Sequence, residues 1–272
     1  MIIDADELIG TNIYLDFASV GATINLMLAA VKAKGKTIIV NAAKEPEIVN
    51  IATFLNNMGA RISGAGTNRI KIEGVEYLHS CFHEVIPDRI EAGTFVILGA
   101  AMSDGLKVTN LIPEHINSLT EKLREMGVPM EIGSDYVYVS KPEHYNPVDI
   151  QTLIYPGFPT DLQQELASLM VLADGTSSID ETIWENRFQN LYELSKMGAR
   201  IKVEGKKGYI YGPTKLHGTT VMATDLRAGA GLVIAGLMAD GETEIQNADY
   251  ILRGYEKIVE KLSNIGATIE LK

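Results

Sequence analysis

Glycine recurs in this sequence in two registers, each with a period close to 70 residues. The first register, with gaps of 70, 70 and 66 residues, contains Gly35, Gly105, Gly175 and Gly241. The second, with gaps of 68, 71 and 68 residues, contains Gly59, Gly127, Gly198 and Gly266. Each glycine follows a segment that reads as a helix, and glycine suits that place because it enters the left-handed conformation without strain. We therefore predict four copies of one structural unit, each with two helices that stop at these glycines.

The two kinds of predicted helix differ in polarity. Residues 22–30 and 231–239 have almost no polar face, which is typical of a buried helix. Helices of the second kind carry one apolar stripe, as at Ile116, Leu119 and Leu123, and such helices are half-exposed. The predicted hairpin strands, such as residues 69–73 and 200–204, alternate between apolar and charged residues, so that one face packs and the other is wet. These patterns predict an inside-out α/β barrel with helices inside and sheets outside, the reverse of a barrel ringed by helices.

Each unit is predicted to run strand, helix, strand, helix and then a two-stranded hairpin (βαβαββ). The strands that open the four units are expected at residues 12–16, 81–85, 149–154 and 219–222. The largest change of character along the chain falls at Ile86-Pro87, where a proline follows a predicted strand and Asp88 can cap the next helix. We therefore expect a domain boundary there.

Charge and composition exclude several classes of protein. Lys and Arg number 24 against 35 for Asp and Glu, a net charge of −11, so a broad basic face for nucleic acid is not expected. Cys81 is the single cysteine, which excludes an internal disulfide and a site built from several thiolates. No apolar run approaches the roughly 20 residues that a bilayer requires. We expect a cytoplasmic protein with no metal and with neither nucleic acid nor membrane as a partner.

Arginines lie at or near the starts of several predicted helices. They are Arg89, Arg187, Arg227 and Arg253. A helix N-terminus and a guanidinium group both suit phosphate or carboxylate, so the four arginines predict one anion-binding surface. These residues also have plainer structural interpretations. Ser19 and Asp88 can serve only as helix N-caps, and Arg227 can be a surface arginine paired with Asp225.

Seven short strings spread along the chain carry a resemblance to a known family. They are Ser19-Val-Gly-Ala-Thr23, Glu45-Pro-Glu-Ile48, Pro87-Asp-Arg-Ile-Glu-Ala-Gly-Thr94, Phe158-Pro-Thr-Asp161, Glu185-Asn-Arg-Phe188, Ala223-Thr-Asp-Leu-Arg-Ala-Gly229 and Arg253-Gly-Tyr-Glu256. Together they resemble the UDP-N-acetylglucosamine 1-carboxyvinyltransferases of the enolpyruvyl transferase family. The shikimate-pathway enolpyruvyl transferase shares that fold but matches these strings poorly.

The resemblance implies an architecture larger than four units. The family has two inside-out α/β domains, each of three βαβαββ units, with the active site between them. Residues 1–86 would then be the last repeat of an incomplete first domain, and residues 87–272 a three-repeat second domain. We expect two preceding units, with the family's Lys-Asn pair and its cysteine loop, to be missing from this chain. An incomplete first domain leaves apolar helix surface uncovered, which predicts self-association through it.

The resemblance also assigns roles to residues of one wall of the site. It implies that Asp161 takes the proton from a sugar 3-hydroxyl and that Asp225 assists proton transfer. Arg227 and Arg253 resemble the pair that holds the phosphate and carboxylate of phosphoenolpyruvate, a task suited to bidentate guanidinium groups. The other expected substrate contacts are Phe17, Ala18, Ser19, Val20, Gly21 and Ile183, together with Arg89 and Arg187 from the arginine pattern.

The implied reaction transfers the enolpyruvyl group of phosphoenolpyruvate to the 3-hydroxyl of UDP-N-acetylglucosamine and releases phosphate. It is the first committed step of peptidoglycan synthesis, which serves cell wall biogenesis, cell shape and cell division, and it implies no cofactor. A chain with one wall of the site is expected to be inactive alone. The alternatives are a non-catalytic ligand-binding or scaffold fragment, or one half of a two-chain enzyme.

Overall fold

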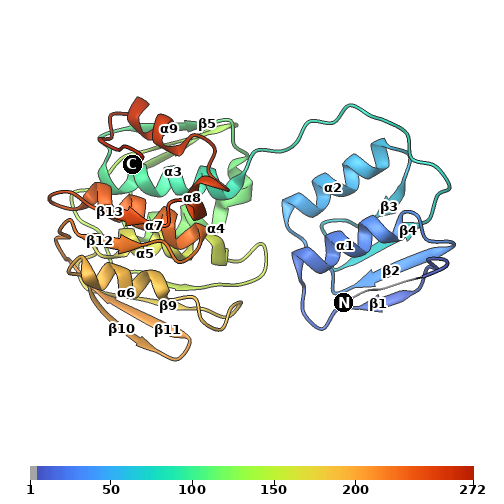
Figure 1. The fold of residues 1–272 in the computed structure, drawn as a ribbon, viewed down its shortest axis with the longest axis horizontal. Coiled ribbons are helices and arrows are strands. Elements are labelled where there is room, and N and C mark those ends of the chain that lie inside the picture. Colours follow the sequence, from blue (N-terminus) through green and yellow to red (C-terminus); the bar gives the residue numbers. More distant parts are fainter. Residues whose placement is uncertain (1–4) are drawn as a thin grey trace. The chain divides into compact units, whose positions relative to one another are not determined.

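The computed structural model describes residues 5–272 and divides into two compact units (Figure 1). Unit 1 extends to Ile86 and includes Ile154–Pro156, and unit 2 comprises Pro87–Leu153 and Gly157–Lys272. Each has its own core of buried apolar side chains. The two units are therefore described separately.

Unit 1 is one repeat, in which two helices cover one face of a four-stranded sheet (Figure 1). Its elements are β1 (Asn12–Tyr14), α1 (Val20–Ala30), β2 (Lys36–Val40), α2 (Pro46–Asn57), β3 (Arg61–Ser63) and β4 (Arg69–Glu73). The strand order is β1-β2-β4-β3, with β1 parallel to β2 and the others antiparallel. The alternating pattern places Ile70 and Ile72 of β4 in the core and leaves Arg69 exposed.

Unit 2 contains three repeats. The first has α3 (Arg89–Met102), β5 (Leu106–Thr109), η1 (Pro113–Ile116), α4 (Asn117–Glu125), β6 (Met130–Ile132) and β7 (Tyr136–Val139). The second has β8 (Asp149–Gln151), η2 (Thr160–Leu162), α5 (Gln163–Met170), β9 (Thr176–Asp180), α6 (Gln189–Lys196), β10 (Arg200–Glu204) and β11 (Lys207–Tyr211). The third has β12 (Thr220–Met222), α7 (Leu226–Met238), β13 (Glu244–Gln246), α8 (Asp249–Leu252) and α9 (Ile258–Asn264). The sheets have the orders β5-β7-β6, β10-β11-β9-β8 and β12-β13.

The first helices of these three repeats pack together at the centre of unit 2 (Figure 1). All eight residues of α5 are buried, and long stretches of α3 and α7 are buried as well. A Cβ at Gly231 of α7 would lie 2.7 Å from the carbonyl oxygen of Gln164 on α5, so the two backbones approach closely. The prediction of helices inside and sheets outside is thus confirmed for unit 2.

Helix α1 differs from α3, α5 and α7. Of its residues only Thr23, Met27 and Ala30 are buried, and Leu28 is 49% exposed. The buried helix expected from the polarity of residues 22–30 alone is therefore wrong for α1, whereas the uncovered apolar surface expected for an incomplete first domain is present. The reason is that unit 1 is a single repeat, and α1 has no second or third first helix of its own unit to pack against.

The predicted strand at residues 81–85 is also wrong, because these residues form no strand. The segment is held against unit 1 instead. The backbone N–H of His79 donates to the Met58 carbonyl at 2.9 Å, and the His83 ring lies 5.2 Å from the Phe54 ring. Among residues 5–272, β5 pairs only with β7, whereas β2, β9 and β13 each have a parallel neighbour.

The two glycine registers turn out to occupy different places. In the second register each glycine directly follows the helix cap and has a positive φ, as predicted, with Gly59 at 98° as an example. In the first register the helices end three to five residues earlier, at Ala30, Met102, Met170 and Met238, so the predicted helix ends are wrong there. Those glycines instead precede the strands. Gly105 lacks a positive φ, and a Cβ there would lie 2.0 Å from the Tyr138 hydroxyl oxygen.

Within residues 5–272, every helix is too short or too polar to cross a lipid bilayer.

Candidate active site

Asp161 is presented by a short turn at the entrance to α5. Phe158 and Leu162, on either side of it, are 4% and 0% exposed and anchor the turn in the core of unit 2. Pro159 precedes the 3-10 turn η2, in which Asp161 is the central residue. The anchored neighbours leave the Asp161 side chain 40% exposed at the surface of the unit.

Two arginines hold the Asp161 carboxylate. Arg187 Nη2 donates to Oδ1 at 2.9 Å, and Arg227 Nη2 donates to Oδ2 at 3.3 Å. The side chains of Arg187 and Arg227 are only 15% and 14% exposed. Burial raises the pKa of Asp161, but the guanidinium groups of Arg227 and Arg187 outweigh that effect and hold the pKa below its usual value. The three groups together carry a net charge of +1, which suits an anionic ligand.

Glu181 organises the loop that carries Arg187. It is 1% exposed, and its Oε1 accepts the backbone N–H groups of Ile183 at 2.9 Å and Trp184 at 3.0 Å. The Thr152 hydroxyl donates to the same oxygen, and the Thr160 hydroxyl donates to Oε2, both at 2.8 Å. Thr160 Oγ1 also accepts from Arg187 Nη1 at 2.8 Å. One buried carboxylate therefore fixes the Arg187 loop and the Asp161 turn together.

On the other side, Arg227 leads into a buried polar cluster. Its Nη1 donates to the Tyr255 hydroxyl at 3.2 Å, and that hydroxyl lies 2.9 Å from Thr94 Oγ1 and 3.1 Å from Glu165 Oε1. Tyr255 is 1% exposed and Glu165 is 0% exposed. Burial raises the pKa of Glu165 to about 8 despite the nearby Arg227. Burial, and then Glu165, also raise the pKa of Tyr255, which is therefore a neutral hydroxyl.

Asp225 caps α7. Its Oδ1 accepts the backbone N–H groups of Arg227 at 2.9 Å and Ala228 at 3.0 Å, and Gln164 Nε2 lies 3.4 Å from Oδ2. The open alternative that paired the Arg227 side chain with Asp225 at the surface is wrong. Only the Arg227 backbone bonds to Asp225, while its buried guanidinium group pairs with Asp161.

The remaining predicted residues of unit 2 lie at helix ends and in the same loop. Arg253 caps the C-terminus of α8, is exposed and lies 6.0 Å from the Tyr250 ring. The next residue, Gly254, approaches the Leu226 side chain at the start of α7. Arg89 is the first residue of α3, behind the N-cap Asp88. Asp161, Arg187 and Arg227 are thus in direct contact.

The segment Phe17–Gly21 belongs to unit 1. Phe17 is 50% exposed, and Ala18 is buried beside it. Ser19 is the N-cap of α1, because its Oγ accepts the backbone N–H of Ala22 at 3.2 Å. Val20 and Gly21 begin the helix. The segment's predicted role in substrate binding stays a prediction.

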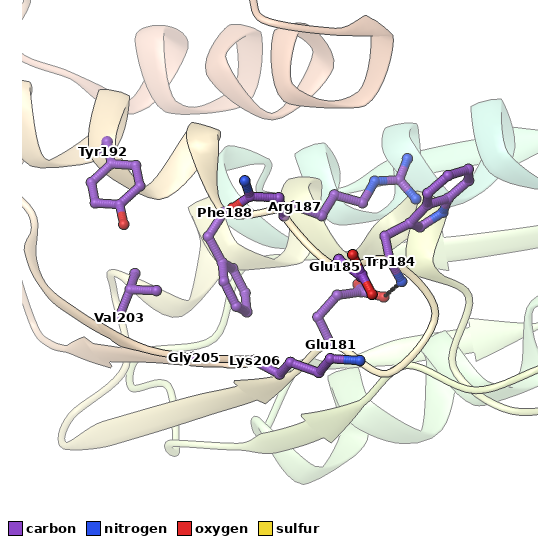
Figure 2. A pocket seen from close by; sticks show the side chains of 10 residues that line it. Glu181, Trp184, Glu185, Arg187, Phe188, Tyr192, Val203, Gly205 and Lys206 are labelled. Atoms are coloured by element: carbon purple, nitrogen blue, oxygen red, sulfur yellow. Dashed lines mark hydrogen bonds between the residues drawn. The ribbon is translucent and has the colours of Figure 1, made fainter.

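A pocket of about 200 Å³ adjoins Arg187 (Figure 2). Figure 2 shows the Arg187 guanidinium group beside the Trp184 ring, with Phe188 and Tyr192 farther along the pocket. The guanidinium carbon lies 5.8 Å from the centre of the Trp184 ring. Lys206, from the β10–β11 turn, closes the opposite side. The Arg187 loop therefore presents an aromatic surface next to the charged cluster.

Sequence reasoning missed four residues of this arrangement, namely Thr160, Glu165, Glu181 and Tyr255. Tyr255 lies in the turn between α8 and α9, outside both helices. A usable signal did exist, because a buried tyrosine needs a hydrogen-bond partner for its hydroxyl. Glu165 gives no comparable signal, because it directly follows two polar residues, Gln163 and Gln164.

Comparisons with known proteins give consistent results. The family model described as EPSP synthase (3-phosphoshikimate 1-carboxyvinyltransferase) matches residues 1–262. The chain is 58% identical over 265 residues to UDP-N-acetylglucosamine 1-carboxyvinyltransferase 2 of Listeria monocytogenes, and also 58% identical to the protein of the same name from Geobacillus kaustophilus. These matches cover 97% of this chain but only 63% and 62% of the two relatives.

Solved structures agree in fold. The enolpyruvyl transferase NikO from Streptomyces tendae superimposes with a TM-score of 0.90 at 31% identity, covering 98% of this chain and 66% of that one. The EPSP synthase from Acinetobacter baumannii has a TM-score of 0.77 at 18% identity, with 98% of this chain and 64% of that one covered, and shows a likeness of fold alone.

Proposed function

The chain belongs to the EPSP synthase (3-phosphoshikimate 1-carboxyvinyltransferase) family, and from that premise we propose that it carries one wall of the active site of a UDP-N-acetylglucosamine 1-carboxyvinyltransferase. The choice of acceptor rests on the 58% identity to the Listeria and Geobacillus relatives of that name. We propose further that residues 1–86 are the last repeat of an incomplete first domain and residues 87–272 a three-repeat second domain.

The observation that carries the proposal is the Asp161 carboxylate held between Arg187 and Arg227. Phosphoenolpyruvate is a small anion with a phosphate and a carboxylate, both of which suit paired guanidinium groups. The low pKa of Asp161 keeps it ionised and ready to accept a proton. A bound anion would partly neutralise the charge of Arg227, and the pKa of Asp161 would then rise toward the range that a general base needs.

In the proposed reaction Asp161 takes the proton of the sugar 3-hydroxyl, and the hydroxyl oxygen bonds to the enol carbon of phosphoenolpyruvate. At the same time an acid protonates the methylene carbon. The resulting adduct then loses a proton from that methyl group and releases phosphate, which restores the double bond. We assign assistance in proton transfer to Asp225 and the holding of the anion to Arg227 and Arg253. Positioning and charge stabilisation supply most of the acceleration in such a scheme.

We assign the remaining substrate contacts to eight further residues. They are Phe17, Ala18, Ser19, Val20, Gly21, Arg89, Ile183 and Arg187. The reaction so proposed needs no cofactor and belongs in the cytoplasm, at the first committed step of peptidoglycan synthesis.

Phosphate release tests the proposal. The 272-residue chain is assayed alone and joined to the remaining part of the Listeria relative, with phosphoenolpyruvate and either UDP-N-acetylglucosamine or shikimate 3-phosphate. We expect no release by the chain alone, release with the nucleotide sugar by the joined protein, and a loss of roughly 100-fold or more in Asp161→Asn. Release only with shikimate 3-phosphate would contradict the assigned acceptor, and an unaffected D161N variant would contradict the assigned base.

A further inference from the structure

Glu165 is a fully buried acid one helical turn beyond Asp161, and the mechanism above makes no use of it. The charged and titratable groups facing it come from three neighbouring elements: Asp161 from η2, Arg227 from α7 and Tyr255 from the turn before α9. Helix α3 contributes the Thr94 hydroxyl, through Tyr255. Within residues 5–272, Oε2 of Glu165 has no hydrogen-bond partner. An ionised carboxylate in such a place would be costly to bury.

Counting the protons available for hydrogen bonds around the Tyr255 hydroxyl gives a second, independent indication that Glu165 is neutral. Its oxygen has three neighbours within hydrogen-bonding distance, and Arg227 can only donate to it. The Thr94 hydroxyl lies 2.9 Å from the Ile90 carbonyl and satisfies it by donating there. Tyr255 then donates its one proton to Thr94, so the contact between Tyr255 and Glu165 needs a proton from Glu165. With neutral Glu165 all four contacts have a proton at once. With ionised Glu165, Tyr255 donates to the carboxylate, and the single proton of the Thr94 hydroxyl cannot serve both Tyr255 and the Ile90 carbonyl.

The protonation of Glu165 sets the charge of the neighbouring site. Asp161, Arg187 and Arg227 sum to +1 when Glu165 is neutral and, with Glu165 included, to zero when it is ionised. We propose that Glu165 is a positioning residue held as a neutral acid, and that through Tyr255 it keeps the Arg227 charge available to the phosphoenolpyruvate anion. This inference rests on the proposed function for the identity of the anion, but the link from Glu165 to Arg227 does not depend on any ligand.

The first measurement reads Arg227 directly, in the 272-residue chain without ligand. Side-chain ¹⁵N–¹H signals of arginine are followed by NMR from pH 6 to 9.5, and the Arg227 signal is assigned by its absence in Arg227→Lys. We expect it to shift with a midpoint near pH 8 in the unaltered chain and to stay constant in Glu165→Gln. Glu193→Gln is the matched control, because Glu193 is a buried glutamate on α6 whose carboxylate bonds to Lys196 and to the backbone N–H of Met222, and it should leave the titration of Arg227 intact.

The second measurement follows phosphoenolpyruvate binding by calorimetry at pH 7 and pH 9. We expect the affinity of the unaltered chain and of E193Q to fall about tenfold more between the two values than the affinity of E165Q. The ionisation of phosphoenolpyruvate itself is common to all three proteins and cancels in this comparison.

Two outcomes would overturn the inference: an Arg227 signal that does not move with pH or moves equally in E165Q, and the same loss of affinity in E165Q as in the unaltered chain. Failure of the proposed function looks different. In that case the Arg227 signal titrates as expected and depends on Glu165, but phosphoenolpyruvate does not bind at either pH.

Discussion

Two carboxyl groups four residues apart are held in opposite ionisation states. Asp161 faces two guanidinium groups at the surface of unit 2, and its pKa is lowered. Glu165 faces the interior, and burial raises its pKa to about 8. Environments that push neighbouring pKa values apart are a physical sign of divided roles, one group accepting a proton and the other keeping one.

The lowered pKa of Asp161 predicts how the free energy of unfolding depends on pH. A carboxyl with a depressed folded-state pKa stabilises the protein above its unfolded pKa, and that contribution is lost as the pH falls through the folded pKa. We expect D161N to lower the free energy of unfolding at pH 7 by about 1 kcal/mol, a modest value because the side chain is 40% exposed. The difference should shrink toward zero below about pH 3.5.

Urea denaturation at several pH values measures this difference. Asp104→Asn is the control, since Asp104 pairs with Lys141 at the surface and is 91% exposed. A D161N variant that loses the same stability at pH 3 as at pH 7 would show that the Asp161 carboxylate does not stabilise the fold by its charge.

Glu181 offers a test with a built-in reporter, because Trp184 is the single tryptophan and its backbone bonds to Glu181. In Glu181→Gln one acceptor oxygen becomes a donor, and the bond from the Thr160 hydroxyl is lost or reversed. We expect a loss of about 1–3 kcal/mol in stability and a red shift of Trp184 emission as the loop loosens. In E193Q, which also removes a buried carboxylate, the emission should be unchanged, and an unchanged emission in E181Q would contradict the role given to Glu181.

The sequence identifies residues of the site by their chemical type, but it does not identify the residues that they contact. Asp161 and Arg227 stand out because a carboxylate and a guanidinium group at helix starts suggest chemistry. Glu165 and Tyr255 did not stand out, since their importance comes from lying together across α5 and the α8–α9 turn, 90 residues apart in the chain. The pairing of Arg227 with Asp161 instead of Asp225 is likewise a matter of packing, which sequence spacing does not fix.

At the scale of elements, the packing of α5 on α7 depends on a small residue at their closest approach. In Gly231→Ala the new Cβ would meet the Gln164 backbone, with its carbonyl oxygen at 2.7 Å and its carbonyl carbon at 3.0 Å. Because backbone atoms cannot turn aside, the helices must separate, and we expect a loss of about 1–3 kcal/mol in the free energy of unfolding.

Gly21→Ala provides the matched control, since a Cβ at that helical position meets nothing within 4 Å. It should leave stability unchanged or raise it by up to about 1 kcal/mol. Urea denaturation of both variants decides the matter, and equal stability of G231A and the unaltered chain would show that α5 and α7 tolerate a wider separation.

Elements were predictable where a local pattern determines them. The second-register glycines ended α2, α4, α6 and α9 correctly, because a left-handed residue after a helix is a local requirement. The strand predicted at residues 81–85 is wrong, because a strand needs a neighbouring strand to pair with. The hydrogen bond of His79 and the ring contact of His83 hold this part of the chain against α2 instead. Non-local competition of this kind leaves no mark in a short stretch of sequence.

At the scale of the whole molecule, the two units differ in the size of their cores. Over residues 5–272, the core of unit 1 contains 13 buried apolar residues and that of unit 2 contains 43. Small cores bury a smaller share of their surface and are less stable. We therefore expect unit 1 to open at a lower free energy than unit 2, with its amides exchanging first.

Native-state hydrogen exchange, read by mass spectrometry over peptides of β2 and α2 against peptides of α5 and α7, measures this difference. Leu119→Ala in the core of unit 2 is a useful comparison, because it should speed exchange in unit 2 and leave unit 1 as it was. A single opening free energy shared by both units would contradict the expectation and would show that they fold as one.

The bonds of Glu181 reach the main chain of residues 183 and 184 and not their side chains. Glu181 therefore fixes the course of the loop through amides that every residue type except proline possesses, while the Trp184 side chain is 58% exposed and lies beside the Arg187 guanidinium group. The bonds that Glu181 makes in this loop do not depend on which side chains the two residues carry. The side chains at positions 183 and 184 can therefore change while these main-chain bonds to Glu181 persist.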